Sequence, residues 1–387
     1  MLQQAIARIP DDASNYLRLG NLYLDAYDFE QAGHAFERAL LRDPASVVAR
    51  LRLSRCFNAG RHFAKALAIL AAACSPDAGV EAEIHMQRGL AFLGQNCGAD
   101  AEEEFRRAVA AFPDHRRALM NLAKLLRRDG RVGELLALCE RLEKRGVRHT
   151  QLLLDWGRAS ALAGDAERTR QLLFDRTRAN CAPIAPPRGF NDVQSFNAAL
   201  ADELLSNPNR LTFFPEDEEA NRGSARVQHL FAGRRPGLIR LLLEIIEERI
   251  DAVAGDITRT GGFDPWRDAM PRHAHLRGWG LIQRGEDYET WHTHRGGWMS
   301  GCYYIAIPPC VTAEGEGRGC IEFGPPPSLA DIAHPIETWR LAPQEGMLLL
   351  APSHYHHRTV PTGAHEYRIS LAFDVIADDQ SAIGVED

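Results

Sequence analysis

The sequence predicts a multidomain α + β protein, with an N-terminal α-solenoid of helical hairpins followed by a β-barrel or sandwich with supporting helices. Three observations carry this prediction. A pattern of small and large apolar residues recurs about every 34–35 positions over the first part of the chain. A proline-rich stretch then breaks the helical period. Beyond about residue 275 the chain changes to short apolar runs separated by Gly/Pro turns, which is typical of a sandwich, barrel or jelly roll.

The composition is that of a globular protein with two or three domains. The chain has 387 residues, of which 45% are hydrophobic and 25% charged, and a formal net charge of -7. This mildly acidic balance argues against a nucleic-acid or membrane-surface role. We expect no transmembrane helix, and no secretory signal at Met1–Ala5. The eight cysteines form no C-x-x-C pair, so we expect a reduced, cytoplasmic protein.

Each repeat alternates positions for small residues with positions for large ones. Small residues let the two helices of a hairpin approach closely, and large ones fill the space to the next hairpin, so several units have to stack. The positions that recur are Tyr16, Gly20, Ala32 and Phe36, then Leu53, Phe57 and Ala66, then Gly89, Ala101 and Phe105, then Leu119 and Ala123, and a worn fifth copy with Trp156 and Gly157. This pattern resembles tetratricopeptide repeats, assigned to residues 1–176, and the resemblance implies a peptide or protein partner.

The junction is predicted to be a stiff linker at residues 177–195, because three prolines fall within residues 183–187. The second domain is assigned to residues 196–387. It should begin with two helices, Phe196–Leu205 and the amphipathic Leu238–Val253, the second lying against a sheet. The predicted strands are Gly278–Gln283, Gly301–Ile307, Gly319–Phe323, Glu337–Leu341, Met347–Ala351 and Arg368–Val375.

Histidines gather beside the predicted strands. His292 and His294 are two residues apart in an extended segment, so their side chains point the same way, and His357 could join them from a facing strand. Imidazole suits iron, zinc, copper and nickel. Arg368 and Ser370 share one face of the last strand, and a buried arginine beside a hydroxyl is a natural dock for a carboxylate. The sequence therefore predicts a metal site next to a carboxylate-binding group.

At these residues the chain resembles a 2-oxoglutarate/Fe(II) oxygenase family that is often joined to tetratricopeptide repeats. The resemblance spans about Val227 to Val375. It implies a double-stranded β-helix of jelly-roll or cupin-like type, with Fe(II) at its open end, 2-oxoglutarate as co-substrate and O2. The segments that carry it are His292-Thr293-His294, Ser300-Gly301-Cys302-Tyr303-Tyr304, Gly346 to Ser353, His357 and Arg368 to Phe373.

The resemblance also implies roles for single residues. His292 takes the first metal position and His357 the distal one, with His294 as the further candidate ligand, and Arg368 with Ser370 binds the far carboxylate of 2-oxoglutarate. His294 departs from the wider superfamily, which usually has Asp or Glu there. Either three imidazoles hold the iron, or His294 faces substrate or water. The remaining cofactor-binding candidate is Tyr303.

Alternatives remain at several positions. His356 adjoins His357 and could exchange roles with it, and His354 is expected to face outward or toward substrate. The nearest carboxylates that could complete a ligand triad are Glu322 and Asp374.

The expected function is that of a dioxygenase (hydroxylase) that oxidises a C–H bond of a peptide or protein held by the repeats. A free amino acid remains open as substrate. Two other hypotheses stay open: a cupin-like three-histidine metalloenzyme that does not use 2-oxoglutarate, and a scaffold without catalysis.

Overall fold

The computed structural model describes residues 12–378 apart from 26, 213–219, 232–236, 263, 295, 313, 326–328 and 330–337. Two predictions fall partly outside the described residues. One is the lack of a secretory signal within residues 1–11, and the other is the predicted strand that begins at Glu337. The chain divides into two compact units, Met1–Leu135 and Leu136–Asp387. Among the described residues, no helix combines the length and apolar character needed to cross a bilayer.

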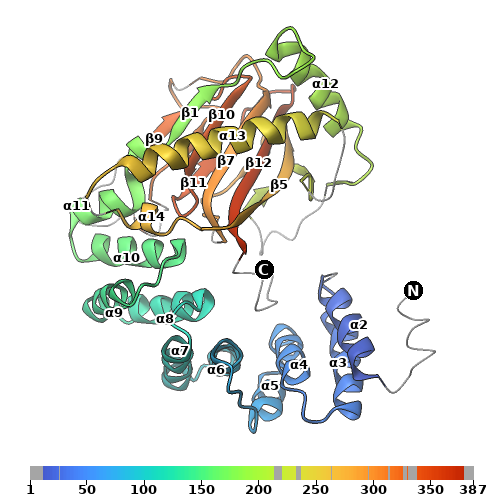
Figure 1. Ribbon diagram of the computed structural model, residues 1–387, viewed down its shortest axis with the longest axis vertical. Coiled ribbons are helices and arrows are strands. Elements are labelled where there is room, and N and C mark those ends of the chain that lie inside the picture. Colours follow the sequence, from blue (N-terminus) through green and yellow to red (C-terminus); the bar gives the residue numbers. More distant parts are fainter. Residues whose placement is uncertain are drawn as a thin grey trace. The chain divides into compact units, whose positions relative to one another are not determined.

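The first unit is a stack of antiparallel helical hairpins, as the repeat pattern predicts (Figure 1). Side chains cap several helices at their first turn; Asp28, Ser46 and Asp77 each accept a backbone N–H three residues on. The helices are α2 (Ala13–Asp25), α3 (Phe29–Arg42), α4 (Val47–Ala59), α5 (Phe63–Leu70), α6 (Ala78–Gly94), α7 (Gly98–Ala111), α8 (Arg116–Arg128) and α9 (Val132–Lys144), the last crossing the unit boundary.

Close packing explains the glycine in the first helix of these hairpins. A Cβ built on Gly20 would lie 2.4 Å from the Phe36 ring, and one on Gly89 would lie 2.5 Å from the Phe105 ring. Both rings are fully buried. The small and large positions of the repeat are therefore the two sides of one contact.

The Gly89→Ala substitution should destabilise the array. Alanine usually stabilises a helix interior by about 0.5–1 kcal/mol relative to glycine. Here its methyl group would overlap the Phe105 ring, and overpacking costs about 1–3 kcal/mol. We expect a lower melting temperature by circular dichroism. Gly133→Ala is the control, because nothing lies within 4 Å of that Cβ; equal melting of both variants would contradict the contact.

The buried carboxylate of Glu83 joins neighbouring hairpins. Glu83 on α6 lies 3.0 Å from His115 Nε2 and 3.6 Å from Arg117 Nη1. Burial by itself raises the pKa of Glu83, but the hydrogen bond from His115 and the charge of Arg117 outweigh it and lower the pKa from its ordinary 4.5. The ionised carboxylate therefore stabilises the folded array at neutral pH.

Acid should remove this stabilisation. Because the folded-state pKa of Glu83 lies below the unfolded one, its contribution is complete above pH 4.5 and is lost as the pH falls through the folded value. Urea denaturation should show Glu83→Gln to be less stable than the unmodified chain at pH 7, with the gap narrowing under acid conditions. A gap that stays constant down to acid pH would show that the carboxylate charge is not what stabilises the array.

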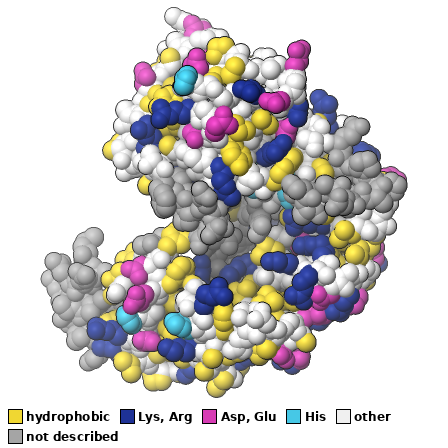
Figure 2. All heavy atoms as spheres, turned by 180° about the vertical axis from the view of Figure 1, so that it is seen from behind, with side chains coloured by type: hydrophobic (Ala, Val, Ile, Leu, Met, Phe, Trp, Pro, Cys, Tyr) yellow, Lys and Arg dark blue, Asp and Glu magenta, His cyan; other side chains and the backbone are white. Residues whose placement is uncertain are grey.

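Charges of both signs are dispersed among apolar side chains over the face drawn in Figure 2. In the first unit Arg106 of α7 pairs with Glu134 of α9, and Arg131, just before α9, pairs with Glu102 of α7. Such exposed pairs individually contribute little to stability.

The second unit is built on antiparallel sheets that face each other, as expected of a jelly roll (Figure 1). All six predicted strands are present. The large sheet has the order β1-β10-β7-β12-β5-β4-β2, with bounds β1 (Asn180–Pro183), β2 (Arg210–Leu211), β4 (Ala225–Val227), β5 (Ala274–Gln283), β7 (Gly297–Ala306), β10 (Met347–Pro352) and β12 (Arg368–Ala377). A three-stranded sheet has the order β11-β8-β9, with bounds β11 (His357–Thr359), β8 (Ile321–Phe323) and β9 (Trp339–Leu341). A two-stranded sheet pairs β3 (Asn221–Arg222) with β6 (Tyr288–Glu289).

Two helices cover the outer face of the large sheet. They are α12 (Val193–Leu205) and α13 (Leu238–Arg259), which contain the two predicted helices. Figure 1 shows α13 crossing the strands, and Arg249 donates to the Pro183 carbonyl of β1 at 3.3 Å. On the inner face, apolar side chains of both sheets form one core cluster: Tyr304, Ile321, Phe323, Leu349, Ala351 and Tyr355.

The stretch predicted to be a linker contributes an edge strand. Residues 180–183 form β1, which pairs with β10 from Asn180↔Leu350 to Pro183↔Met347. Proline lacks a backbone donor and is tolerated at a sheet edge. The local proline signal gave no indication of this pairing, because its partner lies far along the chain.

The fifth hairpin belongs to the second compact unit. It consists of α10 (Thr150–Leu162), α11 (Ala166–Thr169) and the π-helical turn η1 (Arg170–Phe174). The Thr150 hydroxyl donates to the Gly297 carbonyl at 2.8 Å, which ties α10 to the start of β7. The contacts thus divide the chain before α10, whereas the repeat pattern places the end of the array at residue 176.

Candidate metal centre

Three histidines from two segments of the barrel meet at one point. His292 and His294 lie between β6 and β7, and His357 begins β11. The backbones of His292 and His357 exchange two hydrogen bonds of 3.0 Å, which fixes the segments side by side. One ligand nitrogen from each ring lies within 4.8 Å of the others. The structure therefore brings together the three predicted metal ligands.

The outer nitrogen of each ring is held by an acceptor. His292 Nδ1 lies 2.7 Å from the Thr290 carbonyl, and His357 Nδ1 lies 3.0 Å from the Tyr355 carbonyl. A carbonyl can only accept, so both Nδ1 atoms carry the proton and both Nε2 atoms present a lone pair. Burial lowers the pKa of His292 and, more strongly, that of His357, which keeps both rings neutral.

His294 is oriented by a carboxylate instead. Its Nδ1 lies 2.8 Å from Asp374 Oδ1, and Asp374 is 1% exposed and also accepts from the Ser300 hydroxyl at 2.6 Å. Burial lowers the pKa of His294, but the Asp374 charge outweighs it and raises the pKa. A carboxylate behind a histidine is the usual support of a metal ligand. Asp374, considered as a possible ligand from the sequence, here supports His294.

The spacing of the nitrogens suits one ion. His294 Nε2 and His357 Nε2 lie 3.2 Å apart. Two imidazole nitrogens bound at right angles, each about 2.1 Å from an ion, are separated by about 3 Å. The three rings thus resemble one face of a coordination shell.

The Asp374→Asn substitution should weaken metal binding about 10- to 100-fold, the usual effect of losing such a supporting carboxylate. Anaerobic titration with Fe(II) measures the change. Asp378→Asn is the matched control, because Asp378 pairs with His275 in the same way at the exposed surface. Equal affinities in the two variants would show that His294 is not held as a ligand by Asp374.

The neighbouring histidines face elsewhere. His356 Nε2 lies 2.8 Å from Arg158 Nη2 on α10, so its ring is turned toward the fifth hairpin. His354 is buried rather than outward-facing, and its Nε2 lies 2.8 Å from the Leu172 carbonyl. Glu322 is occupied by Arg340 and Arg358 and takes no place among the three rings.

A pocket beside the histidines contains polar groups without partners. Arg368 is 2% exposed and stacks over the Tyr304 ring; one of its Nη atoms bonds Gln283, but its Nε has no hydrogen-bond partner in the described part of the chain. The hydroxyl of Ser370, which lines the pocket, and that of Tyr304, under Arg368, likewise make no hydrogen bond in the described part of the chain, although both lie near the Cys302 thiol. Buried donors without a partner are costly. This set, with a positive charge and two hydroxyls, fits a bound carboxylate.

Tyr303 is not brought to this pocket. Its hydroxyl donates to Asn197 of α12 at 2.6 Å, on the helix-covered face of the large sheet. Neighbouring residues of a strand point to opposite faces, so Tyr304 takes the inner position instead. Both rings are fully buried, so burial could not have distinguished them.

One carboxylate beside the histidines is not singled out by the sequence. Glu289 lines the pocket, is 6% exposed, and has Oε2 3.7 Å from His292 Nε2. Burial raises the pKa of Glu289, but Arg226, whose Nη2 lies 2.7 Å from Oε1, outweighs it and lowers the pKa, so the carboxylate is ionised. The spacing of three residues before His292 was the available signal. Glu289 places a negative charge next to the predicted ion.

Comparisons with known proteins agree with these two parts. Residues 277–374 match the family described as "Putative 2OG-Fe(II) oxygenase", and residues 23–86 and 86–146 match two tetratricopeptide repeat models. No curated protein matches the chain.

Solved structures align with parts of the chain at low identity. YrrB, described as a TPR protein with an unusual peptide-binding site, is 17% identical, with a TM-score of 0.33 over 44% of this chain and 88% of its own. PilW, a type IV pilus biogenesis factor, is 20% identical, with a TM-score of 0.37 over 44% and 79%. A Pseudomonas putida prolyl-4-hydroxylase is 15% identical, with a TM-score of 0.36 over 51% and 92%. The chain therefore joins tetratricopeptide repeats to a C-terminal domain that matches the 2-oxoglutarate/Fe(II) oxygenase family.

Proposed function

We propose that this chain is a non-haem Fe(II)- and 2-oxoglutarate-dependent dioxygenase that hydroxylates a C–H bond of a peptide or protein recruited by its repeats. One observation carries the proposal: one ring nitrogen from each of three histidines converges next to a buried guanidinium and two hydroxyls that make no hydrogen bond among the described residues. A metal ion and a carboxylate co-substrate would satisfy both sets at once.

The residues present fit these groups. His292, His294 and His357 would hold Fe(II), and three ligands on one face leave positions open for a co-substrate and oxygen. Fe(II) with 2-oxoglutarate and O2 supplies the hydroxylation of a C–H bond. The far carboxylate of 2-oxoglutarate would lie against Arg368 and Ser370, with the Tyr304 hydroxyl as a further donor.

The chain itself contributes orientation, charge and exclusion of water. The acceptors on all three Nδ1 atoms prevent the rings from turning away, and the Asp374 carboxylate behind His294 partly offsets the charge of the ion. Apolar side chains of both sheets, among them Ile321, Phe323 and Leu349, line the rest of the pocket. Their dry surface strengthens the ion pair between Arg368 and a carboxylate.

Two other readings make different predictions. A cupin-like enzyme would share the three histidines but would have no use for a carboxylate dock at Arg368. A scaffold without catalysis would not need three lone pairs directed at one point. The unpartnered groups around Arg368 therefore favour the dioxygenase.

The test is mass spectrometry of candidate peptides incubated with the full chain, Fe(II), ascorbate and 2-oxoglutarate. We expect a peptide that gains one oxygen, with succinate formed in step. If the repeats recruit the substrate, the peptide should be hydroxylated with a higher kcat/KM than the same residue as a free amino acid. Oxidation that proceeds without 2-oxoglutarate would instead favour the cupin-like enzyme, and no Fe(II) uptake would favour the scaffold.

A further inference from the structure

A second cavity lies within the C-terminal unit, where the fifth hairpin meets the barrel. It has a volume of about 190 Å³. Its walls come from η1, from α14 (Pro265–Asp268) and from the turn between β10 and β11. The polar residues that line it include Arg170, Asp175, Arg178, Asp264, His354 and Tyr355. None of them belongs to the candidate metal centre.

His354 presents an acceptor without a partner to this cavity. The side chain is 2% exposed, and Nε2 donates to the Leu172 carbonyl at 2.8 Å. Burial lowers the pKa of His354 to about 4, so the ring is neutral and Nδ1 keeps a lone pair. This Nδ1 has no hydrogen-bond partner among the described residues. A buried acceptor of this kind calls for an N–H or O–H donor.

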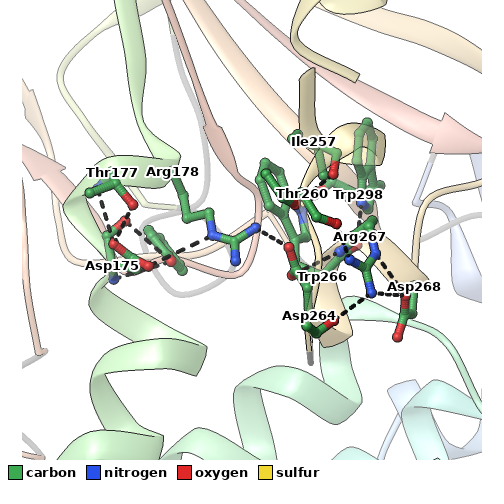
Figure 3. A network of polar contacts seen from close by, with 12 residues as sticks. Asp175, Thr177, Arg178, Ile257, Thr260, Asp264, Trp266, Arg267, Asp268 and Trp298 are labelled. Carbon is green, nitrogen blue, oxygen red and sulfur yellow. Dashed lines mark hydrogen bonds and ion pairs between the residues drawn. The ribbon is translucent and has the colours of Figure 1, made fainter. Parts of the chain in front are cut away.

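Of the two carboxylates of the cavity, Asp264 is engaged through both oxygens and Asp175 through one (Figure 3). Asp264 pairs with Arg178 and caps α14 by accepting from the Arg267 N–H. Asp175 uses Oδ1 to accept from the Thr177 N–H and hydroxyl, whereas its Oδ2 lies 3.8 Å from Arg178 Nε, beyond hydrogen-bond distance. Asp175 Oδ2 and His354 Nδ1 are thus two acceptors that a bound ammonium group could satisfy.

Donors lie at the mouth of the same cavity. Arg170 and Gln171 are exposed residues of η1 that line it. A guanidinium at the rim suits a carboxylate. Arg178 also lines the cavity, but its charge is paired with that of Asp264. The acceptors of His354 and Asp175 and the charge of Arg170, which forms no ion pair among the described residues, therefore suit a ligand with opposite charges at its two ends.

The geometry points to a binding site for a small zwitterion, a free α-amino acid, with its ammonium group between His354 and Asp175 and its carboxylate at Arg170. The cavity has room for a molecule of this size. Trp266, which stacks on Trp298 with ring centroids 5.2 Å apart, and Leu153 give it an apolar wall for the side chain.

The site touches the turn that positions the metal ligands. His354 precedes His357 by three residues, and the carbonyl of the adjacent Ser353 accepts the His294 N–H at 2.8 Å. A ligand bonded to His354 thus holds the turn that joins both histidine segments. Occupancy of the cavity should therefore stabilise the chain.

Isothermal titration calorimetry of the metal-free full chain tests the site. The probes are glycine, L-alanine, L-glutamate and L-arginine, with ethylamine and acetate as the two halves of a zwitterion. We expect saturable binding of at least one amino acid in the millimolar range or tighter, and at least about tenfold weaker binding of each half, because each engages only one end of the cavity.

Two variants locate the binding. His354→Gln keeps a donor for the Leu172 carbonyl but removes the Nδ1 acceptor, and should weaken binding about tenfold. Arg170→Gln, at the exposed rim, should weaken it similarly without disturbing the fold. Arg176→Gln is the matched control, since Arg176 is exposed nearby but does not line the cavity.

The inference would be overturned by no saturable binding of any amino acid, by equal binding of ethylamine or acetate, or by binding that both His354→Gln and Arg170→Gln leave unchanged. Loss of binding in Arg368→Gln alone would assign the ligand to the metal-centre pocket instead. Because the titration needs neither iron nor turnover, its outcome is independent of the proposed dioxygenase activity.

Discussion

Fe(II) binding should be lost when His357 is replaced by alanine. This ring supplies one of three converging nitrogens, and its Nε2 lies 3.2 Å from that of His294. Losing a ligand itself should cost more than the roughly 10- to 100-fold that follows from losing a supporting residue. Anaerobic calorimetric titration with Fe(II) measures the affinity, and succinate formation measures activity. Both should fall to background.

The adjacent residue provides the matched control. His356→Ala removes the same side chain one position earlier, where the ring contacts Arg158 rather than the centre. This variant should keep its Fe(II) affinity. If His357→Ala still binds Fe(II) and His356→Ala does not, then His356 is the ligand and the proposed metal centre is wrong.

Replacing Arg368 by alanine should raise the KM for 2-oxoglutarate steeply. Arg368 is almost fully buried, and a co-substrate carboxylate there would be left without its charged partner. Truncating one member of a buried charged pair costs about 2–5 kcal/mol, or roughly 30-fold and more in affinity. Steady-state kinetics with varied 2-oxoglutarate measure the change, and Fe(II) titration should show unaltered metal binding.

Arg340→Ala serves as the control for the loss of a guanidinium. Arg340 of β9 pairs with Glu322 of the neighbouring strand β8, and it does not line the pocket that contains Arg368. It should leave the KM unchanged. If Arg368→Ala keeps full metal-dependent turnover, the pocket does not bind 2-oxoglutarate. That result would favour the cupin-like enzyme that does not use 2-oxoglutarate.

The sequence was most informative where periodicity and chemistry coincide. The spacing of His292 and His294 placed both rings on one side of an extended segment, and the paired glycine and aromatic positions predicted the hairpin contacts. Long-range pairing was not visible in the same way. Whether residues 180–183 form a strand depends on β10, which lies far along the chain.

The sequence also did not predict which way single side chains point. Tyr303 and Tyr304 are equally buried, so composition could not tell which one faces the pocket. The pairing of β12 with β7 shifts register between Ile369 and Ser370, and such an irregularity changes which residues face inward. Glu289 was missed because a carboxylate in a two-residue strand has no periodicity to mark it.

The bonds from the fifth hairpin to the barrel have a consequence for how this gene can be rearranged. Thr150, Arg158 and Leu172 each bond residues at or next to the histidine segments. Hairpins before α10 can be added, lost or exchanged during evolution without disturbing these bonds. A catalytic fragment excised at the predicted linker would lack them, so α10 to η1 should be inherited together with the enzyme rather than with the other repeats.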